Sequence, residues 1–232
     1  MRTLIGVILC GGLGTRLRAA VPDLPKAMAP VRGRPFLEYQ IERLGRCAVT
    51  EIVLCAGYRW EAIAAHFGEG DRFGVKLHYS VEKTPLGTAG CLKQAEPLLK
   101  GRALVLNGDT FLSLDPRAME QDHCASGALA TLAVVPVPDA GEYGSVTVNA
   151  QGRVVRFREK HPGAGLVNAG ACLLEPAVLQ FLQAGAPASL ERDLLPALLQ
   201  AGAPVYGYPV EGPFLDIGTP DRYQTAQEGL IW

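Results

Sequence analysis

The stretch LIGVILCGGLGTR, residues 4–16, joins an apolar run to a glycine-rich loop. Residues 4–10 carry no charge and predict a buried strand, which ends at Gly11 and Gly12. Glycines at the end of a strand let backbone amides converge on an anion, because no Cβ obstructs the approach. Arg16 adds a guanidinium group that is suited to phosphate oxygens. Since ligands of open α/β sheets bind beyond the carboxyl ends of the strands, the stretch indicates a phosphate-binding loop in an α/β protein.

The loop matches neither of the two best-known nucleotide-binding glycine motifs. Leu17 stands where a dinucleotide-binding fingerprint has its last glycine, and no Gly-Lys-Ser or Gly-Lys-Thr follows as in a P-loop. An ordinary glycine-rich turn is the alternative, and the loop by itself does not decide between the two.

Strand and helix patterns alternate along the first half of the chain. Further apolar runs typical of strands lie at residues 51–56, 75–80 and 103–107, and helical spacing of apolar residues lies at 36–47, 60–67 and 88–99. This alternation predicts right-handed βαβ units and a mostly parallel sheet. After Asp109 the pattern gives strands at 129–137, 145–148, 153–158 and 166–174 with hairpin-like spacing, then a helix at 190–201, a strand at 205–210 and a final helix. One mixed α/β domain over residues 1–232 is the simplest account.

Composition and charge argue against several classes of function. Of the 232 residues, 48% are hydrophobic, so a large core can form. The formal net charge of -1 argues against a protein that binds nucleic acid through a broad basic surface. No apolar run has the length of a signal peptide core or a membrane span, so we expect no membrane partner and a cytoplasmic location.

Cysteines and histidines show no pattern typical of a metal site. The six cysteines form no CxxC pair and several lie in apolar runs, so we expect buried free thiols rather than disulfides. The four histidines lack zinc-site spacing and are expected on the surface or in loops; they are His66, His78, His123 and His161.

Three further residues stand where they can reach the same phosphates as the glycine loop. Lys26 follows Pro25 on a segment that the proline stiffens. Asp109 follows the apolar run 103–106, and Asp216 has a similar setting. Carboxylates at the ends of buried strands lie at the ligand edge of a sheet, so the two aspartates are candidates to hold one Mg²⁺. Taken singly, Lys26 is also typical of a solvated surface lysine, and each aspartate of a helix cap or a turn.

These features occur together and in a fixed order. The ordered motifs are GGLGTR at residues 11–16, PK at 25–26, LGTA at 86–89, NGD at 107–109, EK at 159–160, NAG at 168–170 and DIGTP at 216–220. Together they resemble the sugar-1-phosphate nucleotidyltransferase family, the sugar-nucleotide pyrophosphorylases, over residues 4 to about 223. The resemblance implies an enzyme whose Rossmann-like, mixed and mainly parallel sheet is flanked by helices, the nucleotidyltransferase or glycosyltransferase-A-like fold.

The resemblance also implies a role for each matching residue. Residues 1–110 would bind the nucleotide and residues 111–232 the sugar phosphate. Catalytic roles fall to Arg16, Lys26 and Asp109, and Mg²⁺ would be held by Asp109 and Asp216. The implied nucleotide-binding set is Leu9, Gly11, Gly12, Gly14, Thr15, Arg16, Lys26, Glu82, Gly87 and Thr88, and the implied sugar-phosphate set is Asn107, Gly144, Glu159, Lys160 and Asn168.

The implied reaction needs no general base, because the attacking sugar phosphate is already anionic. It would attack the α-phosphorus of a nucleoside triphosphate in line and displace pyrophosphate, with alignment and charge neutralisation lowering the barrier. Two positions depart from the family pattern: Cys10 replaces a commoner alanine, and Ala27 replaces a commoner proline. Both residues are small, so we expect little effect on the chemistry, and whether Cys10 makes the site sensitive to thiol reagents stays open.

Two stretches bear on the substrates. Residues 35–39, PFLEY, and 189–196, SLERDLLP, are similar to stretches of the compact heptose-1-phosphate guanylyltransferases. GTP and D-glycero-α-D-manno-heptose 1-phosphate are therefore the favoured substrates. Mannose-1-phosphate guanylyltransferase and N-acetylmuramate-1-phosphate uridylyltransferase activities stay open as alternatives.

Two functions from other classes, a glycosyltransferase and a nucleotide sensor, agree less well with the sequence. A glycosyltransferase usually carries an Asp-x-Asp metal motif, whereas this chain has Asn107-Gly108-Asp109. A non-catalytic nucleotide sensor is expected to lose Lys26 or one of the metal aspartates, and this chain keeps them all. The apolar residues 230–232 fit packing on the domain itself or on a second subunit, so a homo-oligomer stays open.

Overall fold

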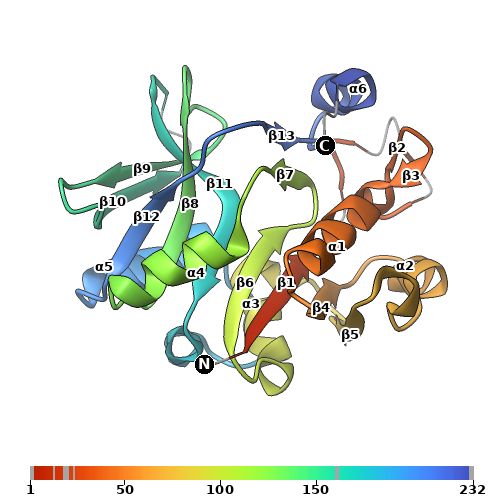
Figure 1. The fold of residues 1–232 in the computed structure, drawn as a ribbon, viewed down its shortest axis with the longest axis horizontal. Coiled ribbons are helices and arrows are strands. Elements are labelled where there is room, and N and C mark those ends of the chain that lie inside the picture. Colours follow the sequence, from red (N-terminus) through yellow and green to blue (C-terminus); the bar gives the residue numbers. More distant parts are fainter. Residues whose placement is uncertain (1–2, 13, 18–20, 23, 160–161, 230–232) are drawn as a thin grey trace.

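A sheet of nine strands forms the centre of the molecule, and helices cover both of its faces (Figure 1). The computed structural model describes residues 3–12, 14–17, 21–22, 24–159 and 162–229. Seven strands follow in the order β10 (Val154–Glu159), β9 (Gly144–Val148), β11 (Gly165–Leu174), β6 (Arg102–Asn107), β1 (Leu4–Leu9), β4 (Glu51–Ala56) and β5 (Lys76–Val81). β8 (Ala130–Val137) and β12 (Val205–Pro209) extend the sheet beside β11. The predicted fold class, a mixed and mainly parallel sheet flanked by helices, is confirmed.

The first half of the chain supplies parallel strands that end together. They are β1 (Leu4–Leu9), β4 (Glu51–Ala56), β5 (Lys76–Val81) and β6 (Arg102–Asn107). β1 lies between β6 and β4, and Leu9 at its end pairs in register with Asn107 at the end of β6. The glycine loop and the residues that follow β6 therefore leave the sheet side by side.

The second half of the chain supplies the strands that make the sheet mixed. They are β8 (Ala130–Val137), β9 (Gly144–Val148), β10 (Val154–Glu159), β11 (Gly165–Leu174) and β12 (Val205–Pro209). β11 joins the halves, because it pairs antiparallel with β6, β8 and β9. The hairpin expected around residue 150 is present as β9 and β10, and its turn has a 2.9 Å hydrogen bond from the Gly152 amide to the Asn149 carbonyl.

The pleat of the parallel strands divides their side chains between two cores. The helices are α1 (Phe36–Arg46), α2 (Trp60–Phe67), α3 (Gly87–Ala95), α4 (Pro116–Ala125), α5 (Leu195–Gln200) and α6 (Pro220–Gly229). Ile8 and Leu54 belong to the core with α1, α2 and α4, whereas Val7 and Val53 belong to the core with α3 and α5. A run that is apolar at every position is what a strand buried on both faces requires.

The structure adds elements that the sequence analysis does not predict. Helix α4 begins at an Asp115 cap, whose carboxylate accepts hydrogen bonds from the amides of Arg117 at 2.9 Å and Ala118 at 3.2 Å. Its apolar face is too narrow to give a periodic signal, although Asp-Pro is typical of a helix start. Two short antiparallel pairs were also missed: β2 (Pro30–Val31) with β3 (Arg34–Pro35), and β7 (Thr110–Leu112) with β13 (Phe214–Asp216).

Two predicted helices differ from expectation where a proline interrupts them. The helix expected at 88–99 ends at Ala95, and a 3-10 turn with Pro97 follows over Glu96–Leu98. The helix expected at 190–201 opens as a π-helical turn, Leu190–Leu194, before α5 begins with Pro196 in its first turn. Proline lacks the amide that would continue the regular hydrogen bonding, which explains both breaks.

Two expectations about single residue types are partly wrong. Cys10, Cys55, Cys91 and Cys172 are buried and free as expected, whereas Cys124 is exposed on α4. His123 is buried at 1% exposure rather than lying on the surface. Its Nδ1 is 2.8 Å from the hydroxyl of Thr131, so a polar partner on β8 allows the imidazole to lie in the core.

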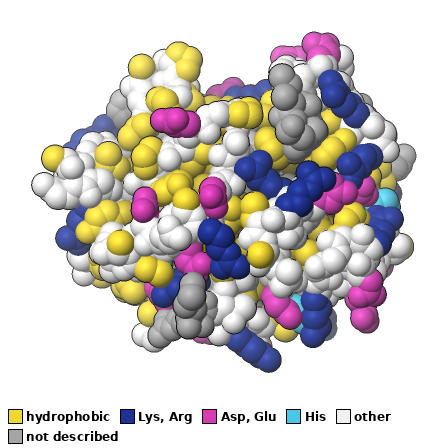
Figure 2. Space-filling model, viewed as in Figure 1, with side chains coloured by type: hydrophobic (Ala, Val, Ile, Leu, Met, Phe, Trp, Pro, Cys, Tyr) yellow, Lys and Arg dark blue, Asp and Glu magenta, His cyan; other side chains and the backbone are white. Residues whose placement is uncertain are grey.

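The surface carries charges of both signs. Lysine and arginine side chains lie among aspartate and glutamate side chains on the face shown in Figure 2, in line with the net charge of -1. In the part of the chain that the structure describes, no helix combines the length and apolar character needed to cross a membrane.

The tight approach of residue 101 to the N-terminal segment gives a test of the fold. A Cβ on Gly101 would overlap the carbonyl oxygen of Thr3, whereas a Cβ on Gly165 would have no atom within 4 Å. We expect Gly101→Ala to lower the free energy of unfolding by about 1–3 kcal/mol, the usual cost of overpacking, and Gly165→Ala to leave it nearly unchanged. Urea denaturation of the two variants measures the difference, and equal midpoints would show that the Thr3 contact is not fixed in solution.

Candidate active site

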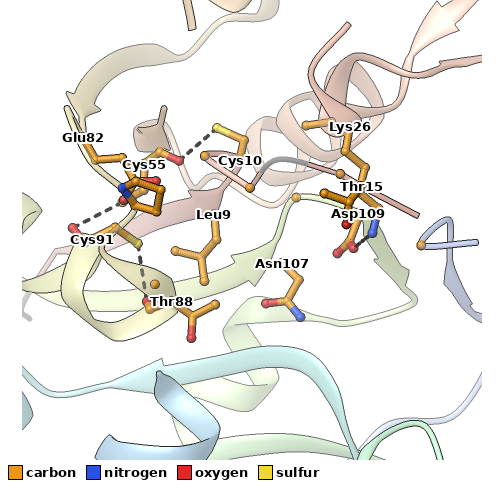
Figure 3. A pocket seen from close by; sticks show the side chains of 18 of the residues that line it. Leu9, Cys10, Thr15, Lys26, Cys55, Glu82, Thr88, Cys91, Asn107 and Asp109 are labelled. Atoms are coloured by element: carbon orange, nitrogen blue, oxygen red, sulfur yellow. Dashed lines mark hydrogen bonds and ion pairs between the residues drawn. The ribbon is translucent and has the colours of Figure 1, made fainter. Parts of the chain in front are cut away.

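A cavity of about 370 Å³ opens at the carboxyl ends of β1 and β6 (Figure 3). Its wall comes from the glycine loop, the segment around Lys26, the start of α3 and the turn after β6. The residues that line it are Leu9, Cys10, Gly11, Gly12, Gly14, Thr15, Arg16, Lys26, Ala27, Cys55, Glu82, Pro85, Gly87, Thr88, Cys91, Asn107, Gly108, Asp109 and Gly218. Every member of the predicted nucleotide-binding set is among them.

Close packing explains two of the glycines in the loop. Gly14 has a φ of +58°, and a Cβ there would lie 2.9 Å from the Cβ of Lys26. A Cβ on Gly11 would lie 2.8 Å from the Oε1 of Glu82. Gly12 has no atom within 4 Å of the position of a Cβ, so its backbone is open to a ligand. The loop is therefore held against a lysine on one side and a glutamate on the other.

Lys26 points to the turn that follows β6. Its ammonium group forms an ion pair with the Oδ2 of Asp109, and the two side chains are 16% and 27% exposed. Figure 3 shows both side chains at one end of the cavity. The φ of -56° at Pro25 leads into the short 3-10 helix Lys26–Met28 that positions the lysine. Lys26 is therefore not a solvated surface lysine.

Asp216 reaches the same edge of the sheet through the short strand β13. β13 pairs antiparallel with β7, and the Ile217 amide donates a 2.9 Å hydrogen bond to the carbonyl of Asp109. The Asp216 carboxylate accepts hydrogen bonds from the Gly218 amide and, at 3.2 Å, from the guanidinium of Arg222. The structure thus brings together the two aspartates that the sequence separates by about a hundred residues.

Burial raises the pKa of Asp216, and the nearby charge of Asp109 raises it further, against the opposing effects of Lys26 and Arg222. A pair of carboxylates that repel each other suits a hard divalent cation with oxygen ligands. In the described part of the chain no cluster of three or more His, Cys, Asp or Glu side chains is placed to hold a metal. The donor set fits Mg²⁺, which is commonly bound by one or two carboxylates together with waters and substrate phosphates.

The remaining nucleotide-side candidates surround the start of α3. The Oε2 of Glu82 accepts a 2.9 Å hydrogen bond from the Leu86 amide. Gly87 has a φ of +73°, and a Cβ there would lie 2.5 Å from the carbonyl oxygen of Ala188. The Thr88 hydroxyl accepts a 2.8 Å hydrogen bond from the Leu190 amide, so a segment of the second half of the chain packs against the start of α3.

The predicted sugar-phosphate residues are only partly brought to the cavity. Asn107 lines it, whereas Gly144 and Asn168 are not among the described residues that line it. Lys160 and the side chain of Glu159 lie outside the part of the chain that the structure describes. Gly144 and Glu159 are register partners at the start of β9 and the end of β10. The Oδ1 of Asn168 is buried without a hydrogen-bond partner.

Three residues at the candidate site have no sequence pattern that would have predicted their position there. Cys55 and Cys91 line the cavity although they lie inside a strand and a helix with no motif of their own. Arg222 contacts Asp216 because the turn into α6 brings residue 222 back over it, and its guanidinium also pairs with Glu142. In the sequence, only the prediction of a helix directly after DIGTP could have indicated the contact between Arg222 and Asp216.

The surroundings of Cys10 argue against a reactive thiol at this position. The thiol is 4% exposed and donates a 3.3 Å hydrogen bond to the carbonyl of Cys55. Burial raises the pKa of Cys10 to about 12. Because the thiolate is the reactive form, this burial disfavours reaction of Cys10 with thiol reagents.

Comparison with known proteins decides the family. The family profile described as nucleotidyl transferase matches residues 5–231. The chain belongs to this family. It is therefore an enzyme of the nucleotidyltransferase class, as the ordered motifs predicted.

Three relatives show how far the similarity extends. The chain is 36% identical over 228 residues to the D-glycero-alpha-D-manno-heptose 1-phosphate guanylyltransferase of Aneurinibacillus thermoaerophilus, with 97% of each chain covered. It is 34% identical to the mannose-1-phosphate guanylyltransferase of Mycobacterium tuberculosis, covering 97% of this chain and 64% of that one. The crystal structure of HddC from Yersinia pseudotuberculosis complexed with GMP-PN superposes with a TM-score of 0.84 at 29% identity, covering 98% and 99% of the two chains.

The raised pKa of Asp216 gives a test with a definite sign. A carboxyl group whose pKa is raised by folding contributes stability below its unfolded pKa and loses that contribution as the pH rises through its folded pKa. We expect Asp216→Asn to melt at a higher temperature than the wild type near pH 8, and the gap to shrink toward about pH 4. Differential scanning fluorimetry in metal-free buffer measures the gap.

The exposed Asp122 on α4 supplies the control. Asp122→Asn is expected to follow the wild-type curve in parallel across the same pH range. A melting temperature of Asp216→Asn that lies below the wild type near pH 8 would contradict the unfavourable setting of this carboxylate.

Proposed function

We propose that the chain transfers a guanylyl group from GTP to D-glycero-α-D-manno-heptose 1-phosphate and releases pyrophosphate, with Mg²⁺ as cofactor. The observation that carries the proposal is the Lys26–Asp109 pair at the end of a cavity lined by the glycine loop. The choice of GTP is supported by the complex of HddC with GMP-PN. The choice of the heptose phosphate is supported by the 36% identity to a heptose 1-phosphate guanylyltransferase over nearly the full length of both chains.

In the proposed reaction, a phosphate oxygen of the sugar phosphate attacks the α-phosphorus of GTP. The bond between this phosphorus and the oxygen of the β-phosphate breaks, and pyrophosphate leaves on the opposite side. The glycine loop and Arg16 would hold the triphosphate, and Lys26 would offset the charge that develops on pyrophosphate. Glu82, Gly87 and Thr88 would surround the base and the ribose.

Asp109 and Asp216 are the residues that would hold Mg²⁺. When bound, Mg²⁺ would supply positive charge that screens the phosphate oxygens of the two substrates from each other. Lys26 and Arg222 already offset the charges of these carboxylates.

The sugar-phosphate side of the proposal involves the second half of the chain, residues 111–232. Asn107, Gly144, Glu159, Lys160 and Asn168 would line this side. The buried and unpartnered Oδ1 of Asn168 supports a ligand that donates a hydrogen bond, such as a sugar hydroxyl. We expect the enzyme in the cytoplasm, where its nucleoside triphosphate is made, and leave a homo-oligomer open.

The experiment that tests the reaction is pyrophosphate release across four nucleoside triphosphates and several sugar 1-phosphates. Release that requires GTP and the heptose phosphate would support the full proposal. Release with mannose 1-phosphate instead would favour the alternative that the 34% identity to a mannose-1-phosphate guanylyltransferase suggests. Absence of release with every pair, from folded protein that binds nucleotide, would favour a nucleotide sensor or a glycosyltransferase.

The ion pair at the end of the cavity predicts two variants that lose activity. We expect Lys26→Met and Asp109→Asn each to lower kcat about a hundredfold, equivalent to ~3 kcal/mol of transition-state stabilisation. Lys83→Met is the matched control, because Lys83 is exposed and does not line the cavity. Steady-state rates at saturating Mg²⁺ measure the effect, and near-normal kcat for folded Lys26→Met would remove Lys26 from its proposed role.

A further inference from the structure

Gln40 is a buried amide on an otherwise apolar side of α1. The side chain is 3% exposed, and its neighbours on the helix, Leu37, Ile41 and Leu44, belong to the core beneath the sheet. Burying an amide is unfavourable unless it finds hydrogen-bond partners, so an apolar residue would be the ordinary choice at this position. The contacts of the side chain explain why this residue is polar.

Both contacts of its amide nitrogen go to the turn that carries Asp109. The Nε2 of Gln40 donates hydrogen bonds to the carbonyl of Asn107 at 2.8 Å and to the carbonyl of Thr110 at 2.7 Å. These two carbonyls flank Gly108 and Asp109 in the chain. Since an amide nitrogen carries two hydrogens, Gln40 fixes both sides of the turn with one rigid group.

The backbone of the same turn is held from two other directions. The Gly108 amide donates a 3.0 Å hydrogen bond to the carbonyl of Leu9, and the Asp109 carbonyl accepts one of 2.9 Å from Ile217. These bonds tie the turn to β1 and to the segment after β13, whereas Gln40 ties it to α1. Gly170 leaves room beside the turn, because a Cβ there would lie 2.9 Å from the Nδ2 of Asn107.

The other end of the amide supports the same conclusion. The Oε1 of Gln40 is buried and has no hydrogen-bond partner among the described residues. Gln40 also lines a small cavity of about 30 Å³, together with Arg43, Thr110 and Gly170. A buried acceptor left unsatisfied costs stability, so the position is not optimised for stability alone. Departures of this kind are expected where function constrains a residue.

We propose that Gln40 is a positioning residue that sets the direction of the Asp109 carboxylate toward Lys26 and Mg²⁺. This role of Gln40 rests on the proposed role of Asp109 in the reaction. Gln40 acts through the backbone of the turn and does not touch a substrate. Small displacements of a charged group at a reaction centre lower the rate strongly even when the substrate still binds. Loss of Gln40 therefore reduces turnover and metal binding more than it reduces nucleotide binding.

The test compares Gln40→Met, which keeps the length and loses the donor, with Gln94→Met as the matched control. Gln94 is an exposed residue of α3 whose Nε2 donates a 3.3 Å hydrogen bond to the hydroxyl of Ser80, and among the described residues it has no hydrogen bond to the turn. We expect Gln40→Met to lower kcat about tenfold or more while the KM for GTP changes less than about twofold. Gln94→Met is expected to keep both values.

A second readout separates positioning from stability and does not depend on turnover. The rise in melting temperature that Mg²⁺ causes, relative to EDTA, is expected to be smaller in Gln40→Met than in the wild type and in Gln94→Met. A purely structural role would lower the melting temperature in EDTA and leave the Mg²⁺-dependent rise unchanged. That outcome, with kcat unchanged in folded protein, would overturn the proposal.

A replacement variant and a wild-type control complete the test. If Gln40→Met does not fold, Gln40→Asn replaces it, because the shorter amide cannot span both carbonyls, and the same two shifts are expected. A wild type that shows the Mg²⁺-dependent rise but releases no pyrophosphate would refute the proposed function, while the role of Gln40 would still be decided by that rise.

Discussion

The parallel pairing of β1 with β6 is the constraint on which the site depends. Because Leu9 and Asn107 lie opposite each other, the two strands end at one level, and a glycine follows within two residues of each end. The Gly108 amide bonds directly to the Leu9 carbonyl, and a Cβ at residue 108 would lie 2.6 Å from that oxygen. The glycine loop and the turn that carries Asp109 are thus joined by a direct backbone contact, to which side-chain contacts are added.

Charge balance then shapes the edge of the sheet. Asp109 and Asp216 are brought within reach of each other, which raises the pKa of the more deeply buried Asp216. Lys26 offsets the first carboxylate and Arg222 the second. Repulsion between carboxylates is unfavourable for folding and favourable for binding a cation, so the proposed metal role and stability would make opposite demands at these two residues.

Much of the fold and of the cavity lining around the glycine loop could be predicted from the sequence, because both depend on local pattern. Apolar runs that end in glycine place Gly11 and Gly108 at strand ends, and the ordered motifs indicate the family. The proximity of Asp216 to Asp109 could only be supposed, since it depends on three-residue strands too short to give a periodic signal. The contacts of Gln40 and Arg222 could not be predicted for a related reason. In the sequence each is an ordinary polar residue in a helix, and only its tertiary contacts distinguish it.

The most direct test of the account follows the individual phosphates of the triphosphate. GTP labelled at the α-phosphate or at the γ-phosphate is incubated with Mg²⁺, the enzyme and the heptose 1-phosphate, and the products are separated. Nucleotidyl transfer predicts that the α label appears in a sugar nucleotide and the γ label in pyrophosphate. A γ label found on the sugar or in orthophosphate, with no α label joined to the sugar, would contradict the account.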